Sequence, residues 1–293
     1  MKILVTGGAG FLGSTIADVL SDAGHDVILF DHIPSPYLRK TQTMVVGDIR
    51  DPTALTAAAE GCGAIYHLAA IADLAQATAN PRTAVEVNIL GTLNALEVAR
   101  QHKVKRFVFA SSIYVYSTQG AIYRTTKQAC ENLIHDYKDN YDLDFTILRF
   151  GSLYGPRTDG NNAIHRIIQQ ALTERRIDFW GNGTEVREYI HVLDAARMSL
   201  DILADEHANQ IIHLTGRERM TTREMLEMVR EILGGDIEIA FNDTPFTGRY
   251  IQTPYAYTPR LGRRMTGSTY IDLGLGLLDQ IQSIEQDRDT SKT

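Results

Sequence analysis

Apolar and amphipathic stretches alternate along the first half of the chain. Short apolar runs, typical of buried strands, occupy residues 2–6, 26–30, 43–47, 64–68, 106–111 and 144–149. Amphipathic stretches with helical spacing lie between most of these runs, at residues 11–23, 51–59, 82–102 and 124–140. Strands that alternate with helices through short connections form parallel sheets whose two faces are covered. The pattern therefore predicts an α/β domain with a doubly wound parallel sheet over residues 1–150.

The pattern changes after residue 150, where strand and helix signals become sparser. Helical stretches occur at 163–173, 192–204 and 222–233, with a turn at 181–184 and a strand at 210–214. Residues 243–269 are rich in Pro, Thr, Tyr and Arg with weak periodicity, which is typical of substrate-facing loops. We expect a smaller substrate-binding domain over residues 151–285, from which the chain returns to the first domain near 190–215. A closing helix at 272–281 and a disordered polar tail at 286–293 complete the prediction.

The composition is that of an ordinary globular protein and excludes several classes of function. The 293 residues carry a net charge of −7, so no basic surface for nucleic acid or anionic membranes is expected. Cys62, Cys130 and the nine histidines show no metal-binding spacing, and a single cysteine pair does not indicate a disulfide scaffold. No apolar run approaches the ~20 residues of a membrane span, and no targeting segment precedes the first strand. These features predict a cytoplasmic protein without a dedicated metal site.

A glycine-rich turn joins the first predicted strand to the first predicted helix. Two glycine spacings, Gly-x-Gly-x-x-Gly and Gly-x-x-Gly-x-x-Gly, are both satisfied by Thr6-Gly7-Gly8-Ala9-Gly10-Phe11-Leu12-Gly13. Glycines permit a tight turn and let the backbone approach a phosphate, whose charge then lies at a helix N-terminus. An isolated turn of this kind can also join a strand to a helix for purely structural reasons. Here the preceding strand and the following helix favour a dinucleotide-binding turn, as in Rossmann-like domains.

Asp31 ends the second predicted strand, eighteen residues after Gly13. A carboxylate at this place accepts hydrogen bonds from the adenosine ribose and repels a 2′-phosphate. NAD is therefore favoured over NADP, although the nearby Arg39 and Lys40 keep NADP open. The predicted cofactor contacts at this end are Gly7, Gly10, Phe11, Leu12, Gly13 and Asp31.

Two further segments follow predicted strands at the same edge of the sheet. Asp48 and Ile49 come after the third strand, where Asp48 either contacts the adenine or serves as a simple turn or helix cap. The segment Leu68-Ala69-Ala70 ends the fourth strand in small residues, which suits close passage of the cofactor. We interpret His67, just before it, as a packed strand residue.

Ser112, Tyr123 and Lys127 provide the candidate chemistry. Tyr123 and Lys127 are four residues apart on a predicted helix and so share one face. An ammonium beside the phenol favours the phenolate and lowers the pKa of the tyrosine toward working pH. Ser112, just after the strand 106–111, can hydrogen-bond a substrate hydroxyl or carbonyl. A Tyr-x-x-x-Lys pair alone is as easily a solvated helix start, but the preceding serine and the nucleotide turn favour redox catalysis.

Together these motifs resemble the extended short-chain dehydrogenase/reductases, in the NAD-dependent nucleotide-sugar epimerase/dehydratase group (UDP-glucose 4-epimerase-like). The resemblance covers most of the chain, through residue 235 or so. Besides the glycine turn, the matching segments are Gly47-Asp48, His67-Leu68-Ala69-Ala70, Asn88-Ile89-Leu90-Gly91-Thr92, Ser111-Ser112, Tyr123-x-x-x-Lys127, residues 148–157 and residues 181–194. So many motifs in this order are specific for the superfamily and much less specific for the reaction.

The resemblance implies roles for individual residues. Tyr123 is the acid/base, Lys127 binds the nicotinamide ribose and tunes Tyr123, and Ser112 orients the sugar hydroxyl. Arg187 matches an arginine that binds the substrate diphosphate, although a surface cap or salt-bridge residue is the structural alternative. The other implied contacts are Asn88 for the cofactor, and Asn162 and, more weakly, Arg249 for the diphosphate.

The resemblance also implies partners. The small-molecule partner is a nucleotide sugar. Members of this group commonly pair through the helices corresponding to 82–102 and 124–140, which implies a homodimer. The apolar face of 82–102 could equally be buried against its own sheet.

Three departures from the pattern of the group narrow the reaction. Ile113 and Tyr114 stand where related dehydratases carry an Asp-Glu pair, so 4,6-dehydration is disfavoured. Ser152 replaces a diphosphate-binding asparagine, which weakens the assignment of UDP, and the gap from Ser112 to Tyr123 is shorter than usual. We therefore expect an NAD-dependent nucleotide-sugar 4-epimerase, with a UDP-hexose favoured, acting through a transient 4-keto sugar. The alternatives are a nucleotide-sugar 4-dehydrogenase or 4-ketoreductase with released NAD(H), and a non-catalytic NAD-binding scaffold.

Overall fold

The computed structural model describes residues 1–217, 219–242 and 250–255. The chain divides into a compact unit, Met1–Thr258, and a second unit, Pro259–Thr293, which lies outside the described residues. The predictions for Arg249, for the helix at 272–281, for the tail at 286–293 and for most of the segment 243–269 also fall outside them. The division into two domains at residue 150 stays a prediction.

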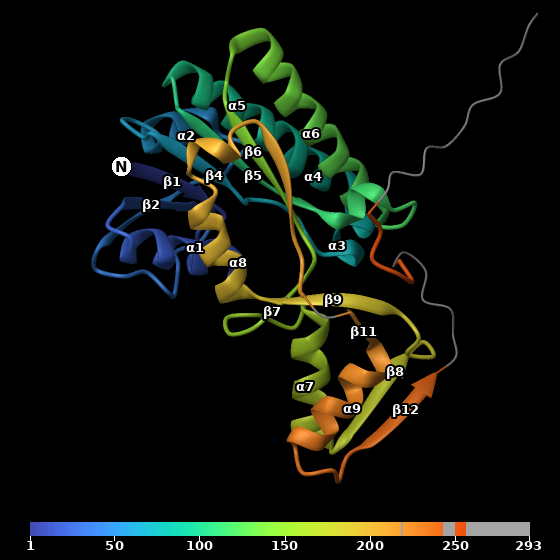
Figure 1. Cartoon of the computed structure of the whole chain (residues 1–293). Helices are drawn as coiled ribbons and strands as arrows, with labels where there is room; N and C mark the ends of the chain where they lie inside the picture. Colours follow the sequence, from blue (N-terminus) through green and yellow to red (C-terminus); the bar gives the residue numbers. More distant parts are fainter. Residues whose placement is uncertain (218, 243–249, 256–293) are drawn as a thin grey trace, which may run out of the picture. The chain divides into compact units, whose positions relative to one another are not determined.

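A seven-stranded parallel sheet forms the centre of the first unit (Figure 1). Its strands are β1 (Lys2–Thr6), β2 (Asp26–Asp31), β3 (Gln42–Val46), β4 (Ala64–His67), β5 (Arg106–Ser112), β6 (Phe145–Phe150) and β10 (Gln210–Leu214). They lie in the order β10-β6-β5-β4-β1-β2-β3, and every neighbouring pair is parallel. This is the doubly wound strand order, extended by β10 beside β6. The predicted Rossmann-like doubly wound sheet is confirmed.

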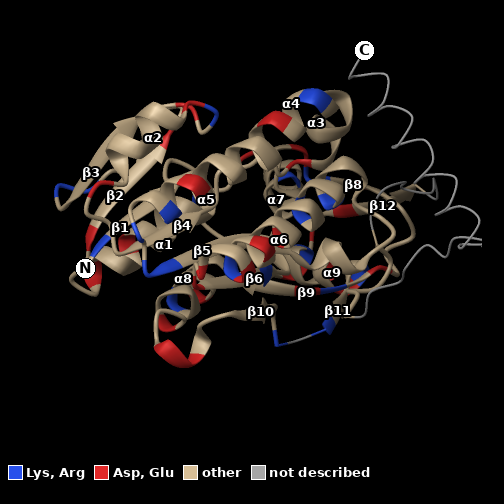
Figure 2. Ribbon diagram, turned by 90° about the horizontal axis from the view of Figure 1, so that it is seen from above, with Lys and Arg blue, Asp and Glu red and all other residues tan. Residues whose placement is uncertain are grey.

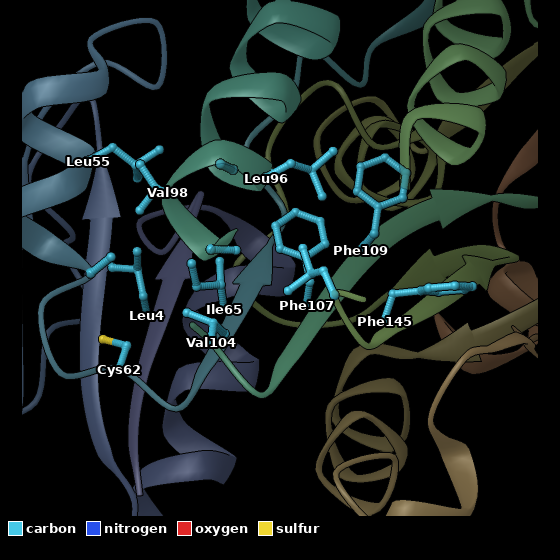
Figure 3. Packing of buried hydrophobic residues seen from close by; sticks show 14 of the residues in the cluster. Leu4, Leu55, Cys62, Ile65, Leu96, Val98, Val104, Phe107, Phe109 and Phe145 are labelled. Atoms are coloured by element: carbon cyan, nitrogen blue, oxygen red, sulfur yellow. The ribbon is translucent and has the colours of Figure 1, made fainter. Parts of the chain in front are cut away.

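Helices cover this sheet, and two separate hydrophobic clusters show that both faces are buried. The helices are α1 (Phe11–Asp22), α2 (Pro52–Ala58), α3 (Leu74–Ala79), α4 (Pro81–Val85), α5 (Gly91–Gln101), α6 (Ala121–Tyr141) and α8 (Val192–Asp201). Because side chains alternate along a strand, Leu4 joins the cluster under α2, α5 and α6, whereas Ile3 and Val5 join the cluster under α1 and α8. Figure 3 shows the first cluster, in which Leu55 and Leu96 from the helices pack toward the strands.

Residues after β6 also form two smaller sheets and a third hydrophobic cluster. The three-stranded sheet has the order β11-β9-β7, and the two-stranded sheet pairs β12 with β8. The elements of this part are β7 (Ser152–Tyr154), α7 (Ala163–Glu174), β8 (Arg176–Trp180), β9 (Val186–His191), β11 (Arg219–Thr221), α9 (Thr222–Ile232) and β12 (Glu238–Asn242). Ala171 of α7, Ile177 of β8 and Leu226 of α9 are fully buried together in the third cluster.

The first unit differs from the sequence prediction in several elements, two of which bear on the candidate site. The stretch 82–102 is not one regular helix, because a π-helical turn, η1 (Glu86–Leu90), separates α4 from α5. Turns of this kind inside helices often occur at functional sites, and this one contains Asn88. The sequence pattern also does not predict β8 and β9, since charged residues such as Arg187 and Glu188 leave no apolar run there.

Candidate active site at the carboxyl edge of the sheet

Four strands of the parallel sheet bring their ends to one edge. β1 and β2 end at Thr6 and Asp31, and β4 and β5 end at His67 and Ser112. Ligands of open α/β sheets bind outside the carboxyl ends of the strands, where the strand order reverses. The fold therefore places the glycine turn, Asp31 and Ser112 at the edge where such sheets bind their ligands.

The glycine turn leaves no room for side chains where it passes the end of β4. Gly7 has a left-handed backbone, with φ of +71°, and a Cβ there would lie 2.8 Å from the Ala69 nitrogen. A Cβ on Gly13 would lie 2.1 Å from the Gly7 carbonyl oxygen. The first residues of α1, directly after its N-cap residue Gly10, are Phe11, Leu12 and Gly13. The turn thus presents backbone N–H groups, rather than side chains, to a phosphate at the start of α1.

Asp31 is buried and lies against the glycine turn. Its Oδ2 accepts a hydrogen bond from the Ala9 N–H at 3.0 Å, and its Oδ1 lies 2.8 Å from His32 Nδ1. The charge of Arg39 is one reason why the sequence leaves NADP possible as the cofactor. In the structure, Arg39 pairs with carboxylates of α1, and its Nε lies 2.9 Å from Asp18 Oδ1. A carboxylate next to the turn suits the ribose hydroxyls of NAD, and the guanidinium that could bind a 2′-phosphate is already paired.

Asp48 forms a turn of its own after β3. Its Oδ1 accepts a hydrogen bond from the Arg50 N–H at 2.9 Å, and its carboxylate pairs with the Arg50 guanidinium. Hydrogen bonding to that guanidinium lowers the pKa of Asp48 to about 2. The cap of α2 is Asp51 rather than Asp48, and Ile49 is buried. Contact of Asp48 or Ile49 with the adenine stays a prediction.

Asn88 fastens the segment that follows β4. Its Oδ1 accepts from the Ile71 N–H at 2.7 Å, and its Nδ2 donates to the Ile71 carbonyl at 3.1 Å and to Thr126 Oγ1 at 3.0 Å. Ile71 directly follows Leu68-Ala69-Ala70, the segment predicted to lie along the cofactor. The buried amide of Asn88 therefore positions that segment, and a direct contact of Asn88 with the cofactor stays a prediction.

His67 is a buried strand residue, as the sequence predicts. Its Nδ1 lies 2.8 Å from Thr6 Oγ1, and its Nε2 lies 3.0 Å from Thr92 Oγ1. Burial lowers the pKa of His67 to about 3, so the ring is neutral at physiological pH. The neutral ring ties the end of β1 to α5 behind the glycine turn.

Ser112, Tyr123 and Lys127 meet at the end of β5. Ser112 is the last residue of β5, and its Oγ caps a 3-10 turn, η2 (Ile113–Tyr116). Tyr123 and Lys127 lie one turn apart in α6, and Tyr123 is hydrogen-bonded to Ser112. Lys127 Nζ donates to the Ala110 carbonyl oxygen at 2.7 Å and lies 5.8 Å from the centre of the Tyr123 ring. The fold thus brings together the three residues that the sequence nominates for catalysis.

Burial governs the titration of both groups on α6. It raises the pKa of Tyr123 to about 12, although the hydrogen bond with Ser112 acts in the opposite direction. It lowers the pKa of Lys127 to about 8, so the ammonium stays largely protonated at neutral pH. The sequence predicts that Lys127 lowers the pKa of Tyr123, whereas in the structure burial raises that pKa. Lys127 Nζ donates to the Ala110 carbonyl oxygen and not to the phenol.

A row of aromatic rings connects Tyr123 to Arg187. The ring centres of Tyr123 and Tyr114 are 6.4 Å apart, and those of Tyr114 and Tyr250 are 4.7 Å apart. The Arg187 guanidinium lies 4.2 Å from the centre of the Tyr250 ring and donates through Nη1 to two backbone carbonyl oxygens. Arg187 is only 9% exposed, so it is not a surface salt-bridge residue. We call Tyr123, Tyr114 and Tyr250 the aromatic row.

Asn162 is the N-cap residue of α7. Its Oδ1 accepts hydrogen bonds from the Ile164 and His165 N–H groups, and its Nδ2 donates to the Leu153 carbonyl oxygen at 2.9 Å. The amide therefore joins the start of α7 to β7. Its contact with a substrate diphosphate stays a prediction.

A buried ion pair lies next to the three candidate catalytic residues, and the sequence pattern does not predict it. The Glu131 carboxylate accepts hydrogen bonds from the Arg149 guanidinium at 3.0 and 2.6 Å and from Ser111 Oγ at 2.5 Å. The available signal is that Glu131 follows Lys127 by four residues and so shares its side of α6. Tyr250 is also missed, because the weakly periodic segment around it gives no reason to choose it over neighbouring tyrosines.

Two other kinds of site, a metal centre and a membrane span, have no counterpart among the described residues. No group of three His, Cys, Asp or Glu side chains among them is arranged to hold a metal ion. None of the helices in this part of the chain is long and apolar enough to cross a bilayer. Acidic and basic residues are mixed over these elements (Figure 2), and both cysteines are buried and free.

Known proteins resemble the chain both in sequence and in structure. Residues 3–214 match the model of the NAD dependent epimerase/dehydratase family. An uncharacterized UDP-glucose epimerase of Bacillus subtilis (strain 168) is 30% identical over 272 residues, which cover 83% of this chain and 85% of the relative. The UDP-glucose 4-epimerase of Thermotoga maritima, solved with UDP-glucose, superposes with a TM-score of 0.81 at 27% identity, covering 88% and 90% of the two chains. The UDP-glucuronic acid 4-epimerase of Bacillus cereus, in complex with UDP-glucuronic acid and NAD, gives 0.79 at 26% identity, covering 89% and 95%.

Proposed function

Since the chain belongs to the NAD dependent epimerase/dehydratase family, we propose that this NAD-dependent enzyme is a nucleotide-sugar 4-epimerase. The proposed substrate is a UDP-hexose, which passes through a transient 4-keto sugar. One observation carries the proposal: Ser112, Tyr123 and Lys127 meet at the edge that holds the glycine turn, and the aromatic row leads from them to Arg187. The relatives described above are epimerases of UDP-glucose and UDP-glucuronic acid, which supports a UDP sugar.

The residues at the sheet edge fit NAD. A Cβ at Gly7 or Gly13 would fill the turn, so these positions suit a phosphate that approaches the backbone. The proposed cofactor contacts are the backbone from Gly7 to Gly13 for the pyrophosphate, Asp31 for the adenosine ribose, and Tyr123 and Lys127 for the nicotinamide ribose. When bound, NAD supplies a reversible acceptor for the hydride of the sugar carbon.

Tyr123 is the proposed acid and base. It takes the proton of the C4 hydroxyl in the first half of the reaction and gives it back in the second half, while Ser112 holds the same oxygen. Burial raises the pKa of Tyr123 to about 12, so a phenolate needs positive charge nearby. Lys127 supplies that charge because it is largely protonated at neutral pH.

Arg187 is the proposed anchor for the substrate diphosphate while the keto sugar rotates to present its other face. A guanidinium can bind phosphate oxygens through two parallel N–H groups, and the Tyr250 ring holds its plane. Aromatic faces pack against a sugar without fixing a particular hydroxyl, so Tyr114 and Tyr250 suit a ring that must present both faces. Ile113 and Tyr114 provide no carboxylic acid to expel water, which favours epimerisation over dehydration.

The homodimer remains part of the proposal. Val85 and Leu90, on the segment 82–102, are 40% and 48% exposed, and Tyr141 at the end of α6 is 54% exposed. Apolar side chains that stay exposed on these helices support an interface there. Light scattering on the purified protein measures its mass and tests this point.

A panel of UDP-glucose, UDP-galactose and UDP-glucuronic acid tests the reaction. We expect inversion at C4 in both directions, seen by NMR of the sugar, with no net change in NADH absorbance. Net formation or consumption of NADH would instead indicate the 4-dehydrogenase or 4-ketoreductase. No turnover of any sugar by protein that carries NAD would contradict the proposal and favour a binding role.

A further inference from the structure

Arg157 connects parts of the chain that are far apart in sequence. It lies in the loop between β7 and α7 and has a left-handed backbone, with φ of +72°, which is uncommon for a residue other than glycine. Such a conformation persists when surrounding contacts hold it. Its Nη1 donates to Ser14 Oγ at 3.1 Å, and its Nη2 donates to Asp18 Oδ2 at 2.7 Å, both on α1.

The same guanidinium also holds the connection that follows Asp31. It lies 4.5 Å from the centre of the Tyr37 ring, in the segment 32–41 between β2 and β3. Ser14 stands in the first turn of α1, where its N–H donates to the Gly10 carbonyl oxygen at 3.0 Å. Arg157 thus touches the helix that begins at the glycine turn and the segment that begins at the ribose-binding carboxylate.

Asp18 is the common acceptor for these contacts. Its carboxylate is buried and accepts hydrogen bonds from Arg39 and Gln42 on Oδ1 and from Arg157 on Oδ2. We call Asp18, Arg39, Gln42 and Arg157 the Asp18 cluster. A buried carboxylate that loses a charged partner is left poorly compensated, so the cluster favours a single arrangement of α1, the segment 32–41 and the β7–α7 loop.

We propose that Arg157 is a positioning residue that retains NAD. By fastening the β7–α7 loop to α1 and to Tyr37, it keeps the adenosine end of the cofactor site closed. The inference rests on the proposed function, because an epimerase regenerates its cofactor in each turnover and gains from holding it between the two half-reactions. Arg157 acts through Asp18 and Tyr37 and makes no contact with the reacting atoms.

The test is the rate at which bound NAD leaves the protein in the absence of sugar. Wild type and variants are loaded with NAD and diluted into a large excess of isotope-labelled NAD, and the unlabelled NAD that remains bound is measured by mass spectrometry. Arg157→Ala is expected to release NAD roughly tenfold faster or more, because changes in affinity act mainly on dissociation. Arg157→Lys keeps the charge but not the two-pronged contact, so its rate should fall between those of wild type and Arg157→Ala.

Two further variants separate the proposed role from a simple effect of charge. Arg166→Ala removes a guanidinium that, among the described residues, donates to the Gly160 and Asn161 carbonyl oxygens of the same loop and not to α1, and it should release NAD at the wild-type rate. Asp18→Asn leaves Arg157 in place but removes its ionic partner, so it should also speed release. Thermal melting of each variant establishes that it is folded.

Specific results would overturn the inference. The inference is wrong if a folded Arg157→Ala protein releases NAD at the wild-type rate. It is also wrong if Arg157→Ala releases NAD faster while Asp18→Asn releases it at the wild-type rate, because Arg157 would then act on the cofactor by its charge. Because no sugar is present, these outcomes are independent of the reaction. Failure of wild type to invert C4 would remove the proposed function and leave the measured retention standing.

Discussion

The two ends of the candidate site are built in different ways. The proposed cofactor end depends mainly on one short turn, residues 7–13, where a methyl group added to Gly13 would lie 2.1 Å from a backbone oxygen. At the substrate end Arg187, Tyr114 and Tyr250 come from three separate segments and meet through side-chain contacts. Close backbone contacts at the cofactor end allow only glycine at these positions. Contacts between rings at the substrate end could be formed by other side chains as well.

This difference explains why a cofactor is easier to identify than a sugar. The glycine turn needs a left-handed backbone at Gly7 and no Cβ at Gly7 or Gly13, and glycine is the residue type that meets both requirements. A sugar site needs only suitable surfaces at suitable distances, which many sequences supply. Variants at the cofactor end should therefore change the affinity for NAD, and variants at the substrate end should change KM for the sugar.

The largest effect is expected between the two ends, at the phenol itself. Tyr123→Phe should lower kcat by roughly 10²–10⁴-fold, because general acid–base catalysis contributes that much. Bound NAD, measured by mass spectrometry, should be largely retained, because the glycine turn, Asp31 and Lys127 still hold it. Tyr141→Phe, at the exposed end of the same helix, is the matched control and should retain full activity. Retained activity in Tyr123→Phe would contradict the assignment of the acid and base.

The ion pair beside the catalytic residues should have the largest effect on stability. Arg149→Met leaves the Glu131 carboxylate buried without its charged partner, which costs about 3–5 kcal/mol of unfolding free energy. Urea denaturation measures the loss. The double variant Glu131→Gln, Arg149→Met removes both charges and should recover part of it. Equal stability of the single variant and wild type would show that the pair is not needed.

The cofactor end is tested by Gly13→Ala. The added Cβ must push the Gly7 carbonyl away, and overpacking of this kind costs about 1–3 kcal/mol, which corresponds to roughly 5- to 150-fold weaker NAD binding. Titration calorimetry with NAD measures the change. Gly160→Ala is the control, since a Cβ there meets open space. A Gly13→Ala protein that binds NAD like wild type would mean that the turn does not cradle the cofactor.

The substrate end is tested by Arg187→Lys. A lysine keeps the positive charge but loses both the stacking on Tyr250 and the two-pronged contact with phosphates. We expect KM for the UDP sugar to rise roughly tenfold, about 1.4 kcal/mol, with kcat and NAD affinity little changed. Arg197→Lys, on the exposed side of α8, serves as the control. A fall in NAD affinity instead would place Arg187 at the other end of the site.

At neutral pH the smallest effect concerns His67, which supports the proposed cofactor end. Its pKa is lowered to about 3 in the folded protein, so the unfolded chain binds one more proton between about pH 6.5 and 3. Stability is therefore complete above about pH 6.5 and decreases as the pH falls through this range, by about 1.4 kcal/mol per pH unit from this residue. His67→Asn should lack that part of the slope, measured by denaturation at several pH values. An unchanged slope would show that His67 is not the group that titrates.

The sequence by itself determines the parallel α/β sheet, the glycine turn, Asp31 and the Tyr123–Lys127 pair. These features are readable because each depends on local geometry: alternation along strands, a left-handed glycine, a carboxylate at a strand end, or a spacing of one helical turn. The π-helical turn at Asn88 marks the limit, since the periodicity of 82–102 continues through it.

Only the tertiary structure decides how the remaining groups are used. Asn88 and Asn162 share the residue type of ligand-binding amides, yet their hydrogen bonds go mostly to backbone groups of neighbouring segments, and Asn88 also donates to Thr126 Oγ1. The contact of Arg187 with Tyr250 and the contact of Arg157 with Asp18 join segments that are distant along the chain, and the Glu131–Arg149 pair joins α6 to the strand that follows it. Such contacts depend on how whole helices and strands pack against one another, and packing leaves no periodic signal in either partner's own segment.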